Sequence, residues 1–340
     1  MTKSVLEVED LVIRFEGRDR TLQVVDGINF VVDDGEIVAV VGESGCGKSV
    51  TTMASVNLLP RNAEVHATAI RIGGREVYPF DRKTLQQVRG KSVGFVFQEP
   101  LRALNPAMRV GRQLQEVTTR HLGLSRLQGV QRSIKYLDLV DIPNPEQVAR
   151  MYPHELSGGM RQRVTIAIAI ICDPLLLIAD EPTTALDVTI QAGILETLRR
   201  LRKTTQLSIL LVSHDLGVVA DIADRVLVMY AGRIVESAPV DKLFASPAHP
   251  YTQALLKAMP TRKLKRLIEI PGSVPMFDRS QTACAFASRC ARSTDKCTTS
   301  PPALAEFAVC HKVACFHPGS DAVANGQRDS GLHTILTSSQ

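Results

Sequence analysis

Tryptophan is absent from this 340-residue chain, and aromatic residues make up only 4% of it. A surface of aromatic side chains that stacks on single-stranded nucleic acid is therefore not expected. The longest apolar stretches, residues 164–172 and 175–179, are separated by Asp173-Pro174 and are much shorter than the roughly 20 residues of a membrane-spanning helix. The N-terminus shows no basic segment followed by an apolar one, as a secretory signal requires. The sequence predicts a protein that stays in the cytosol and does not cross a bilayer by itself.

Neither sign of charge is in large excess. The chain has 40 Lys and Arg and 35 Asp and Glu, which gives a net charge of +5. This balance suits an acidic partner without requiring one. Hydrophobic residues make up 44% and charged residues 22%, which is typical of a globular chain and excludes disordered, collagen-like and coiled-coil classes. At this length we expect about two structural units.

Short apolar runs alternate with helix-like segments over residues 1–245. Residues 36–41, 175–180 and 208–213 are largely apolar runs bounded by Gly, Asp or Ser. Runs of this length and composition are typical of parallel strands that are buried on both faces. The pattern therefore predicts an α/β fold.

Two departures from this alternation suggest the domain organisation. Residues 101–151 have mixed polarity, a helical period and few strand formers, so we expect a helical subdomain at about residues 101–172. Prolines become frequent from residue 246 onward. We expect an ATPase-like unit at residues 1–245, a C-terminal extension at 246–318 and a polar, mobile tail at 319–340.

Residues 42–49 read GESGCGKS and match the pattern GxxxxGK[ST]. They follow a predicted strand and precede a helix-compatible run at 49–58, which is the context of a phosphate-binding loop. The backbone N–H groups and the helix N-terminus would attract phosphate, Lys48 would reach the β- and γ-phosphates, and Ser49 would ligate Mg²⁺. We therefore predict ATP or GTP binding, with a plain glycine-rich turn as the alternative. The residues expected at the nucleotide are Gly42, Ser44, Gly45, Cys46, Gly47, Lys48 and Ser49.

Cys46 stands inside this loop. Its simplest role is that of a small filler, because the loop uses its backbone. It would also be a thiol beside the phosphates, and nearby positive charge would favour the thiolate.

The predicted strand at 175–179 ends in Asp180-Glu181. In parallel sheets, nucleotides bind at the carboxyl ends of the strands. Asp180 would hold Mg²⁺ through water, and Glu181 would orient or deprotonate the attacking water. The alternative is an acidic pair that caps the turn before Pro182.

Four further motifs follow the phosphate loop along the chain, two before Asp180-Glu181 and two after this pair. They are FQEP at 97–100, LSGGMRQR at 156–163, ALD at 185–187 and SHD at 213–215. The ordered set resembles that of the ATP-binding cassette (ABC) ATPases. The resemblance implies a RecA-like parallel-sheet core, an N-terminal antiparallel β region, a helical subdomain and a small irregular C-terminal domain that contains cysteines.

The resemblance also implies roles for single residues at the nucleotide. Gln98 would reach Mg²⁺ and the attacking water from a flexible loop. His214 would hydrogen-bond the γ-phosphate, and Phe15 would stack on adenine.

The signature at 156–163 points to a second subunit. Ser157, Gly158 and Gly159 would open a helix whose exposed N–H groups bind an anion. By resemblance they complete the nucleotide site of a facing subunit, and Asp187 ties the two subunits together. Because the chain has one phosphate loop and one signature, two complete sites require two cassettes placed head to tail.

Two C-terminal segments narrow the resemblance. Residues 246–256 read SPAHPYTQALL and residues 271–275 read PGSVP, similar to the oligopeptide, dipeptide and nickel importer ATPases. This implies an ATPase subunit that powers import of peptides or a similar small solute, bound peripherally to the cytoplasmic face of the inner membrane. Its partners would be two transmembrane permease subunits, the second cassette and an extracytoplasmic substrate-binding protein. Resemblance to the peptide-importer ATPases favours a paralogue as the second cassette. The alternative is a soluble, non-transport ABC ATPase that acts on nucleic acid.

Five of the seven cysteines lie between residues 284 and 315. In a reducing compartment this clustering indicates metal ligation more than disulfides, and four thiolates suit zinc or an iron–sulfur cluster. The spacing is not the CxxC of structural zinc, which favours a [4Fe–4S] cluster; reduced free cysteines and labile disulfides are the alternatives. Resemblance to peptide-importer ATPases indicates Cys284, Cys290, Cys297 and Cys315 as ligands. Cys310 is then a spare thiol or an alternate ligand.

Overall fold

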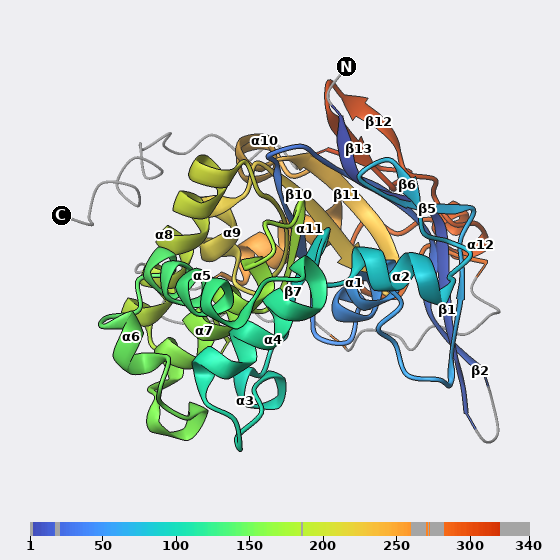
Figure 1. The fold of residues 1–340 in the computed structure, drawn as a ribbon. Coiled ribbons are helices and arrows are strands. Elements are labelled where there is room, and N and C mark those ends of the chain that lie inside the picture. Colours follow the sequence, from blue (N-terminus) through green and yellow to red (C-terminus); the bar gives the residue numbers. More distant parts are fainter. Residues whose placement is uncertain are drawn as a thin grey trace.

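The computed structural model describes residues 3–17, 21–184, 186–259, 270, 272 and 282–319, and within these ranges an eight-stranded sheet runs through the molecule (Figure 1). The strand order is β12-β13-β11-β10-β3-β9-β8-β7, and all neighbours from β10 to β7 are parallel. The parallel strands are β3 (Ile37–Val41), β7 (Val93–Val96), β8 (Leu176–Asp180), β9 (Ser208–Val212) and β10 (Arg225–Tyr230). The predicted α/β fold is confirmed.

Strand β3 is buried on both faces, and its residues alternate between two cores. Ile37, Ala39 and Val41 lie in one core, together with residues of the covering helices α7 (Gly158–Ile170), α8 (Val188–Thr205) and α9 (Leu216–Ile222). Val38 and Val40 lie in the other core, which faces the N-terminal strands. A strand covered on both sides has no solvated face, so its sequence is uniformly apolar.

The N-terminal strands form a separate antiparallel sheet, as the resemblance implied. Strand β1 (Ser4–Glu16) pairs with β2 (Thr21–Asp33), β4 (Ala63–His66) and β5 (Ala69–Ile72), and β5 pairs with β6 (Arg75–Glu76). Helix α1 (Lys48–Ser55) contacts both β1 and β2. The antiparallel sheet thereby lies against the helix that follows β3.

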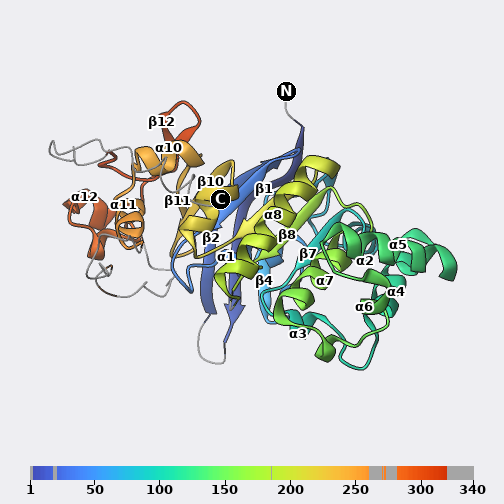
Figure 2. The ribbon, with the colours of Figure 1, turned by 90° about the vertical axis from the view of Figure 1, so that its left-hand side faces the viewer.

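Residues 100–170 are helical apart from turns, and they lie at one end of the molecule (Figure 2). Helix α4 (Val110–Leu122) is capped by Gly123, whose φ of 65° lies in the left-handed region that glycine adopts readily. The next helix begins at Ser125, where Ser125 and Gln128 form a capping box. The elements are α3 (Pro100–Ala103), α4 (Val110–Leu122), α5 (Arg126–Leu139), α6 (Pro145–Val148) and η1 (Pro153–Glu155), before α7. Helix α2 (Arg82–Val88) precedes β7.

The described residues from 240 to 319, here called the C-terminal segment, add two strands to the edge of the central sheet. Strand β13 (His311–Val313) pairs with β11 (Arg233–Pro239) and with β12 (Ala305–Ala308), all antiparallel. The segment also contains α10 (Val240–Ala245), α11 (Pro250–Lys257), η2 (Ala287–Arg289) and α12 (Asp295–Thr299). The predicted tail lies outside the described residues except for Gly319, as do Ala185 and residues 271 and 273–275 of the PGSVP segment.

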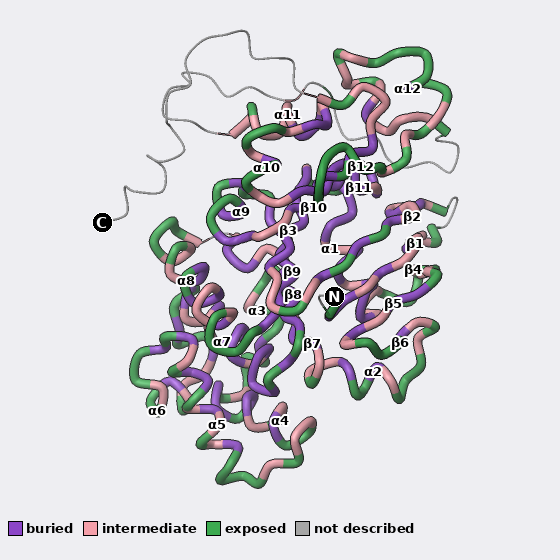
Figure 3. The backbone as a smooth tube through the Cα atoms, turned by 90° about the horizontal axis from the view of Figure 1, so that it is seen from above, coloured by how far each residue is buried: buried purple, intermediate pink, exposed green. Residues whose placement is uncertain are grey.

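The distribution of buried residues follows this arrangement of sheets and helices. Buried residues run along the central strands, and exposed residues gather on the outer helices α5 and α6 and on the outer turns (Figure 3). No helix within the described ranges is long and apolar enough to cross a membrane.

Candidate nucleotide site

The predicted phosphate loop connects β3 to α1, and its backbone requires glycine. Gly42 has a φ of 153°, and a Cβ there would lie 2.2 Å from the carbonyl oxygen of Met229. Gly47 has a φ of 106°, and a Cβ there would lie 2.8 Å from the Met229 side chain. Because β10 approaches the loop so closely, a side chain at either position would displace the loop.

Lys48 lies within this loop and is only 5% exposed. Its Nζ donates hydrogen bonds to the carbonyl oxygens of Gly42, at 2.9 Å, and Glu43, at 3.0 Å. The side chain therefore folds back along the loop, with its charge beside the backbone that would surround a phosphate.

Ser49 and Asp180 meet at the end of β8. The Ser49 hydroxyl donates to Asp180 Oδ1 at 2.8 Å, and the Asp180 carboxyl is buried. Burial raises the pKa of Asp180, while the hydrogen bond from Ser49 acts in the opposite direction. A hydroxyl and a carboxylate are the hard oxygen ligands that Mg²⁺ prefers, so this pair fits the predicted ion in kind and in placement.

Three side chains lie around one carboxylate oxygen of Glu181. Its Oε2 accepts from Gln98 Nε2 at 2.9 Å and from the Thr184 hydroxyl at 2.8 Å, and it lies 3.2 Å from His214 Nδ1. The residue itself has a φ of 46°, in the left-handed region that residues other than glycine rarely adopt. The structure thus brings together Gln98, Glu181 and His214. It adds Thr184, three residues after Glu181, which was not among the predicted site residues.

Cys46 is buried, and burial raises the pKa of its thiol even though Lys48 acts in the opposite direction. The distance from Cys46 Sγ to Lys48 Nζ is 3.9 Å. Lys48 does favour the thiolate, as expected, but loss of solvation outweighs the nearby charge and favours the neutral thiol. The structure agrees with the simpler role of Cys46 as a small filler.

The signature begins helix α7. Ser157 is the N-cap of this helix and accepts a hydrogen bond from Met160 N at 3.3 Å, while Gly159 lies so close to Ile190 that a Cβ would approach it to 2.6 Å. Ser157 and Gly158 are exposed. Within the described ranges, no hydrogen bond or ion pair joins residues 157–159 to residues 42–49 of the same chain.

Asp187 and Phe15 lie in different parts of the fold. Asp187 caps helix α8 by accepting from Ile190 N at 2.9 Å, and it is exposed next to Val188, which is 83% exposed. Phe15 lies on β1, half-buried, with Leu22 and Ala63 as its neighbours on the adjoining strands. Their predicted roles toward a second subunit and adenine stay predictions.

Four cysteines of the C-terminal segment converge. Cys284, Cys290, Cys297 and Cys315 line one cavity of about 10 Å³. However, no group of three or more His, Cys, Asp or Glu side chains in the described part of the chain could hold a metal ion as these side chains stand. The predicted [4Fe–4S] cluster is therefore not confirmed. Cys310 is exposed and does not line the cavity.

Two further contacts to the phosphate loop have no signal in the sequence. The Glu43 N–H donates to the Tyr251 hydroxyl at 2.8 Å, and the Glu43 carboxylate forms an ion pair with Arg289, also at 2.8 Å. Tyr251 belongs to the SPAHPYTQALL segment, but that pattern does not indicate where the ring lies.

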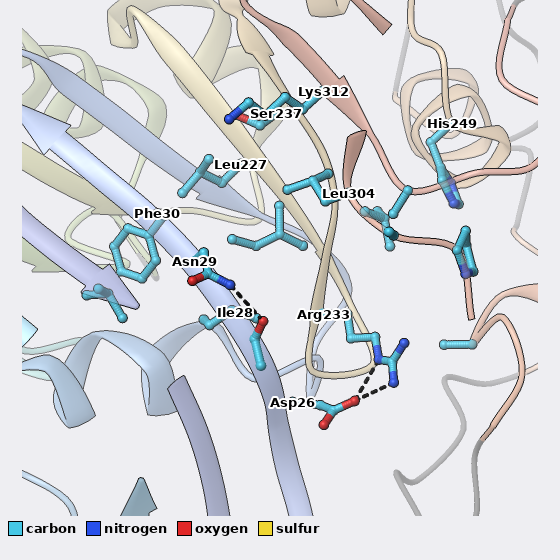
Figure 4. A pocket seen from close by; sticks show the side chains of 18 of the residues that line it. Asp26, Ile28, Asn29, Phe30, Leu227, Arg233, Ser237, His249, Leu304 and Lys312 are labelled. Atoms are coloured by element: carbon cyan, nitrogen blue, oxygen red, sulfur yellow. Dashed lines mark hydrogen bonds and ion pairs between the residues drawn. The ribbon is translucent and has the colours of Figure 1, made fainter. Parts of the chain in front are cut away.

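A larger cavity, of about 810 Å³, lies between β2, β11 and the C-terminal segment (Figure 4). Asp26 and Arg233 form an ion pair in its wall, and Phe30 and Leu304 supply apolar surface. None of the predicted nucleotide residues is among the described side chains that line it. This cavity is therefore separate from the phosphate site.

Comparison with known proteins agrees with this geometry. A family model described as "ABC transporter" matches residues 25–184, and one described as "Oligopeptide/dipeptide transporter, C-terminal region" matches residues 235–297. A putative peptide import ATP-binding protein of Brucella abortus (strain 2308) is 45% identical over 325 residues, which covers 92% of this chain and 96% of the relative. The oligopeptide transport ATP-binding protein AppD of Bacillus subtilis (strain 168) is 44% identical over 316 residues, with 92% and 96% covered. Among solved structures, cbiO1 of Clostridium perfringens, part of the ABC transporter complex cbiONQ, is 28% identical with a TM-score of 0.62, covering 72% of this chain and 91% of that one.

Proposed function

The chain belongs to the ABC transporter family of ATP-binding proteins, and on this basis we propose that it hydrolyses ATP to drive peptide import through an ABC transporter. The observation that carries the proposal is the extent of the similarity. It covers 92% of the chain in relatives named for peptide transport, and it includes the C-terminal region at residues 235–297. No observation favours the alternative of a soluble ATPase that acts on nucleic acid.

ATP would bind with its phosphates against the loop at residues 42–49. Lys48 brings its charge to the β- and γ-phosphates, and the N-terminus of α1 adds partial positive charge. Ser49 and Asp180, joined by their 2.8 Å hydrogen bond, would hold Mg²⁺. The ion would neutralise phosphate charge as the reaction proceeds.

Hydrolysis would depend on Glu181. A water molecule on this carboxylate attacks the γ-phosphorus, its proton passes to Glu181, and the bond from that phosphorus to the oxygen retained by ADP breaks. Gln98 and His214 contact the same carboxylate oxygen, at 2.9 and 3.2 Å. They would hold Glu181 and the water in one orientation.

A complete site would need a second cassette in a head-to-tail pair, with a paralogue as the partner. Ser157, Gly158 and Asp187 are exposed, so they are accessible to the nucleotide or the backbone of a facing subunit. The N-terminus of α7 carries partial positive charge, which suits the γ-phosphate. Closure of the pair on ATP and reopening after hydrolysis would produce the motion that drives transport.

The permease subunits would dock at a groove of about 1240 Å³ between α2 and α4. Leu85 and Val117 supply apolar surface there, and Arg82, Arg89 and Arg120 supply positive charge. A cytoplasmic segment of a permease with acidic and apolar side chains would fit this lining. This arrangement would hold the chain at the cytoplasmic face of the inner membrane, with a substrate-binding protein on the opposite side.

The [4Fe–4S] cluster stays part of the proposal and takes no part in hydrolysis. Four soft sulfur donors around one cavity are the correct kind of ligand. Iron and acid-labile sulfide are measured after anaerobic purification of the wild type, of Cys297→Ser and of the control Cys310→Ser. Loss of iron only in Cys297→Ser supports the cluster, and a wild-type protein without iron rules it out.

The experiment that tests the function is reconstitution. The chain is co-expressed with permease subunits encoded beside it, extracted in detergent and placed in proteoliposomes with labelled peptides. ATP-dependent peptide uptake that fails with Glu181→Gln is expected. An ATPase that co-purifies with nucleic acid, is stimulated by it and supports no uptake would contradict the proposal.

A further inference from the structure

Glu43, the second residue of the phosphate loop, is held by two side chains from the C-terminal segment. The Tyr251 hydroxyl accepts a hydrogen bond from Glu43 N at 2.8 Å. Arg289 donates through Nη1 to Glu43 Oε2 at 2.8 Å and through Nη2 to Oε1 at 3.1 Å. This two-bond geometry between guanidinium and carboxylate fixes direction as well as distance.

The contact to Tyr251 fixes the orientation of one peptide group. A trans peptide is planar, so its N–H and its C=O point in opposite directions. In the peptide that joins Gly42 to Glu43, the N–H points to Tyr251 while the C=O accepts from Lys48 Nζ at 2.9 Å. Tyr251 and Lys48 therefore bond opposite edges of the same peptide group, and a rotation of this group that releases one contact also breaks the other.

The two C-terminal side chains are themselves firmly held. The Tyr251 ring is fully buried, with ring centroids 4.6 Å from Tyr230 and 5.4 Å from Phe286. The Arg289 side chain is 4% exposed and also donates to the Tyr230 hydroxyl at 3.2 Å. Burial of the ring raises the pKa of Tyr251, so the hydroxyl stays neutral and can accept the Glu43 N–H.

We propose that Tyr251 and Arg289 are positioning residues of the nucleotide site, which set the Gly42–Glu43 peptide and through it Lys48 for the phosphates of ATP. This inference rests on the proposed function. It makes the C-terminal segment a part of the ATPase, because a partly buried ion pair and a buried hydroxyl reach the loop from residues that the ABC family model, which ends at residue 184, does not cover.

Loss of the Tyr251 or Arg289 contact should affect ATP binding and not the chemical step. Tyr251 and Arg289 bond the phosphate loop at Glu43, whereas Gln98 and His214 contact Glu181. Substitution of Tyr251 or Arg289 therefore leaves the groups around Glu181 in place for the chemical step at saturating ATP. Loss of orientation at Lys48 weakens binding of the phosphates. The expected signature is a raised KM for ATP with kcat retained.

The test uses the full-length chain and measures ATP affinity together with the thermal unfolding midpoint. Tyr251→Phe keeps the ring and removes the hydroxyl, and we expect it to raise the Kd for ATP about three- to tenfold, the effect of one lost hydrogen bond. Arg289→Lys keeps the charge and loses the two-bond geometry, and an increase of similar size is expected. In a Lys48→Ala background, Tyr251→Phe should change the Kd by less than about twofold, because both act through one peptide.

Tyr136→Phe is the matched control. Tyr136 is also a buried tyrosine, but its hydroxyl bonds Asp173 and Arg132 in the helical region. Tyr136→Phe should lower the unfolding midpoint without changing the Kd for ATP. An unchanged Kd in both Tyr251→Phe and Arg289→Lys, with wild type binding ATP normally, overturns the positioning role alone. A wild-type chain that does not bind ATP overturns the proposed function instead.

Discussion

The Nδ1 atom of His214 lies 3.2 Å from Oε2 of Glu181. Glu181 directly follows β8 and His214 follows β9, and these strands are parallel neighbours in which Asp180 is paired with Val212. The carboxyl ends of parallel strands meet at one edge of a sheet, so residues after them can share a site. This contact places the imidazole ring of His214 beside the carboxylate that is proposed to accept the proton of water.

The first prediction concerns this carboxylate. Glu181→Gln keeps the shape of the side chain and removes the base, so kcat should fall by about 10²- to 10⁴-fold. Affinity for ATP should persist, because Lys48 and Ser49 are untouched, and the closed pair should accumulate with ATP bound. Single-turnover hydrolysis and nucleotide binding measure the two effects. Glu196→Gln, on the exposed side of α8, is the control, and wild-type turnover by Glu181→Gln in a purified complex would refute the role.

The second prediction concerns Lys48. Lys48→Ala removes the buried charge beside the loop, and the Kd for ATP should rise by at least about tenfold, as expected for loss of a charged hydrogen bond. Equilibrium titration with a fluorescent ATP analogue measures it. Lys135→Ala, an exposed lysine on α5, should bind as wild type does. Unchanged affinity in Lys48→Ala would show that the phosphate site has been placed wrongly.

A third prediction concerns stability. Glu236 on β11 is fully buried and accepts hydrogen bonds from the backbone N–H groups of Ala248 and His249, at 2.7 and 2.9 Å. It also lies 2.7 Å from His311 Nε2. Glu236→Ala leaves these groups buried without a partner, so the free energy of unfolding should fall by about 3 kcal/mol or more. Urea denaturation measures this loss.

Glu306→Ala is the comparison for that measurement, since Glu306 is exposed on β12. It should change the free energy of unfolding by less than about 0.5 kcal/mol. Similar small losses in both variants would show that Glu236 does not join β11 to the C-terminal segment.

The fourth prediction concerns thiol chemistry and pH. Burial raises the pKa of Cys172 to about 11, so at pH 8 its thiolate fraction is about a hundredfold below that of a thiol with a pKa of 9. Raising the pH toward 11 should increase its alkylation, whereas the exposed Cys310 should already react with iodoacetamide at pH 8. Peptide mass spectrometry follows both sites. Faster labelling of Cys172 than of Cys310 at pH 8 would contradict the burial described here.

The local chemistry of the site could be predicted from the sequence. The phosphate loop and Asp180 are marked by a strand, a turn and a helix in succession, and each lies where that pattern indicates. Gln98 and His214 could be predicted only through the resemblance, because a single Gln or His after a strand has no pattern of its own. The structure adds their common contact with Glu181.

What the sequence could not predict depends on contacts between distant parts of the chain. Tyr251 and Arg289 reach Glu43 across 208 and 246 residues, and no local periodicity indicates such a contact. The net effect on the Cys46 thiol could not be predicted for the same reason. The charge of Lys48 is visible in the sequence, but the burial that outweighs it comes from the fold.

We propose that one chain supplies the phosphate loop and Glu181 while its neighbour supplies the signature. The most direct test is the rate of ATP hydrolysis per chain, measured for a protein kept monomeric, as verified by light scattering, and for the same chain in the assembled transporter. If the neighbour's signature completes the site, the monomer is slower by at least about 100-fold, the effect of losing a donor to the developing negative charge. Equal rates in the two states would contradict it.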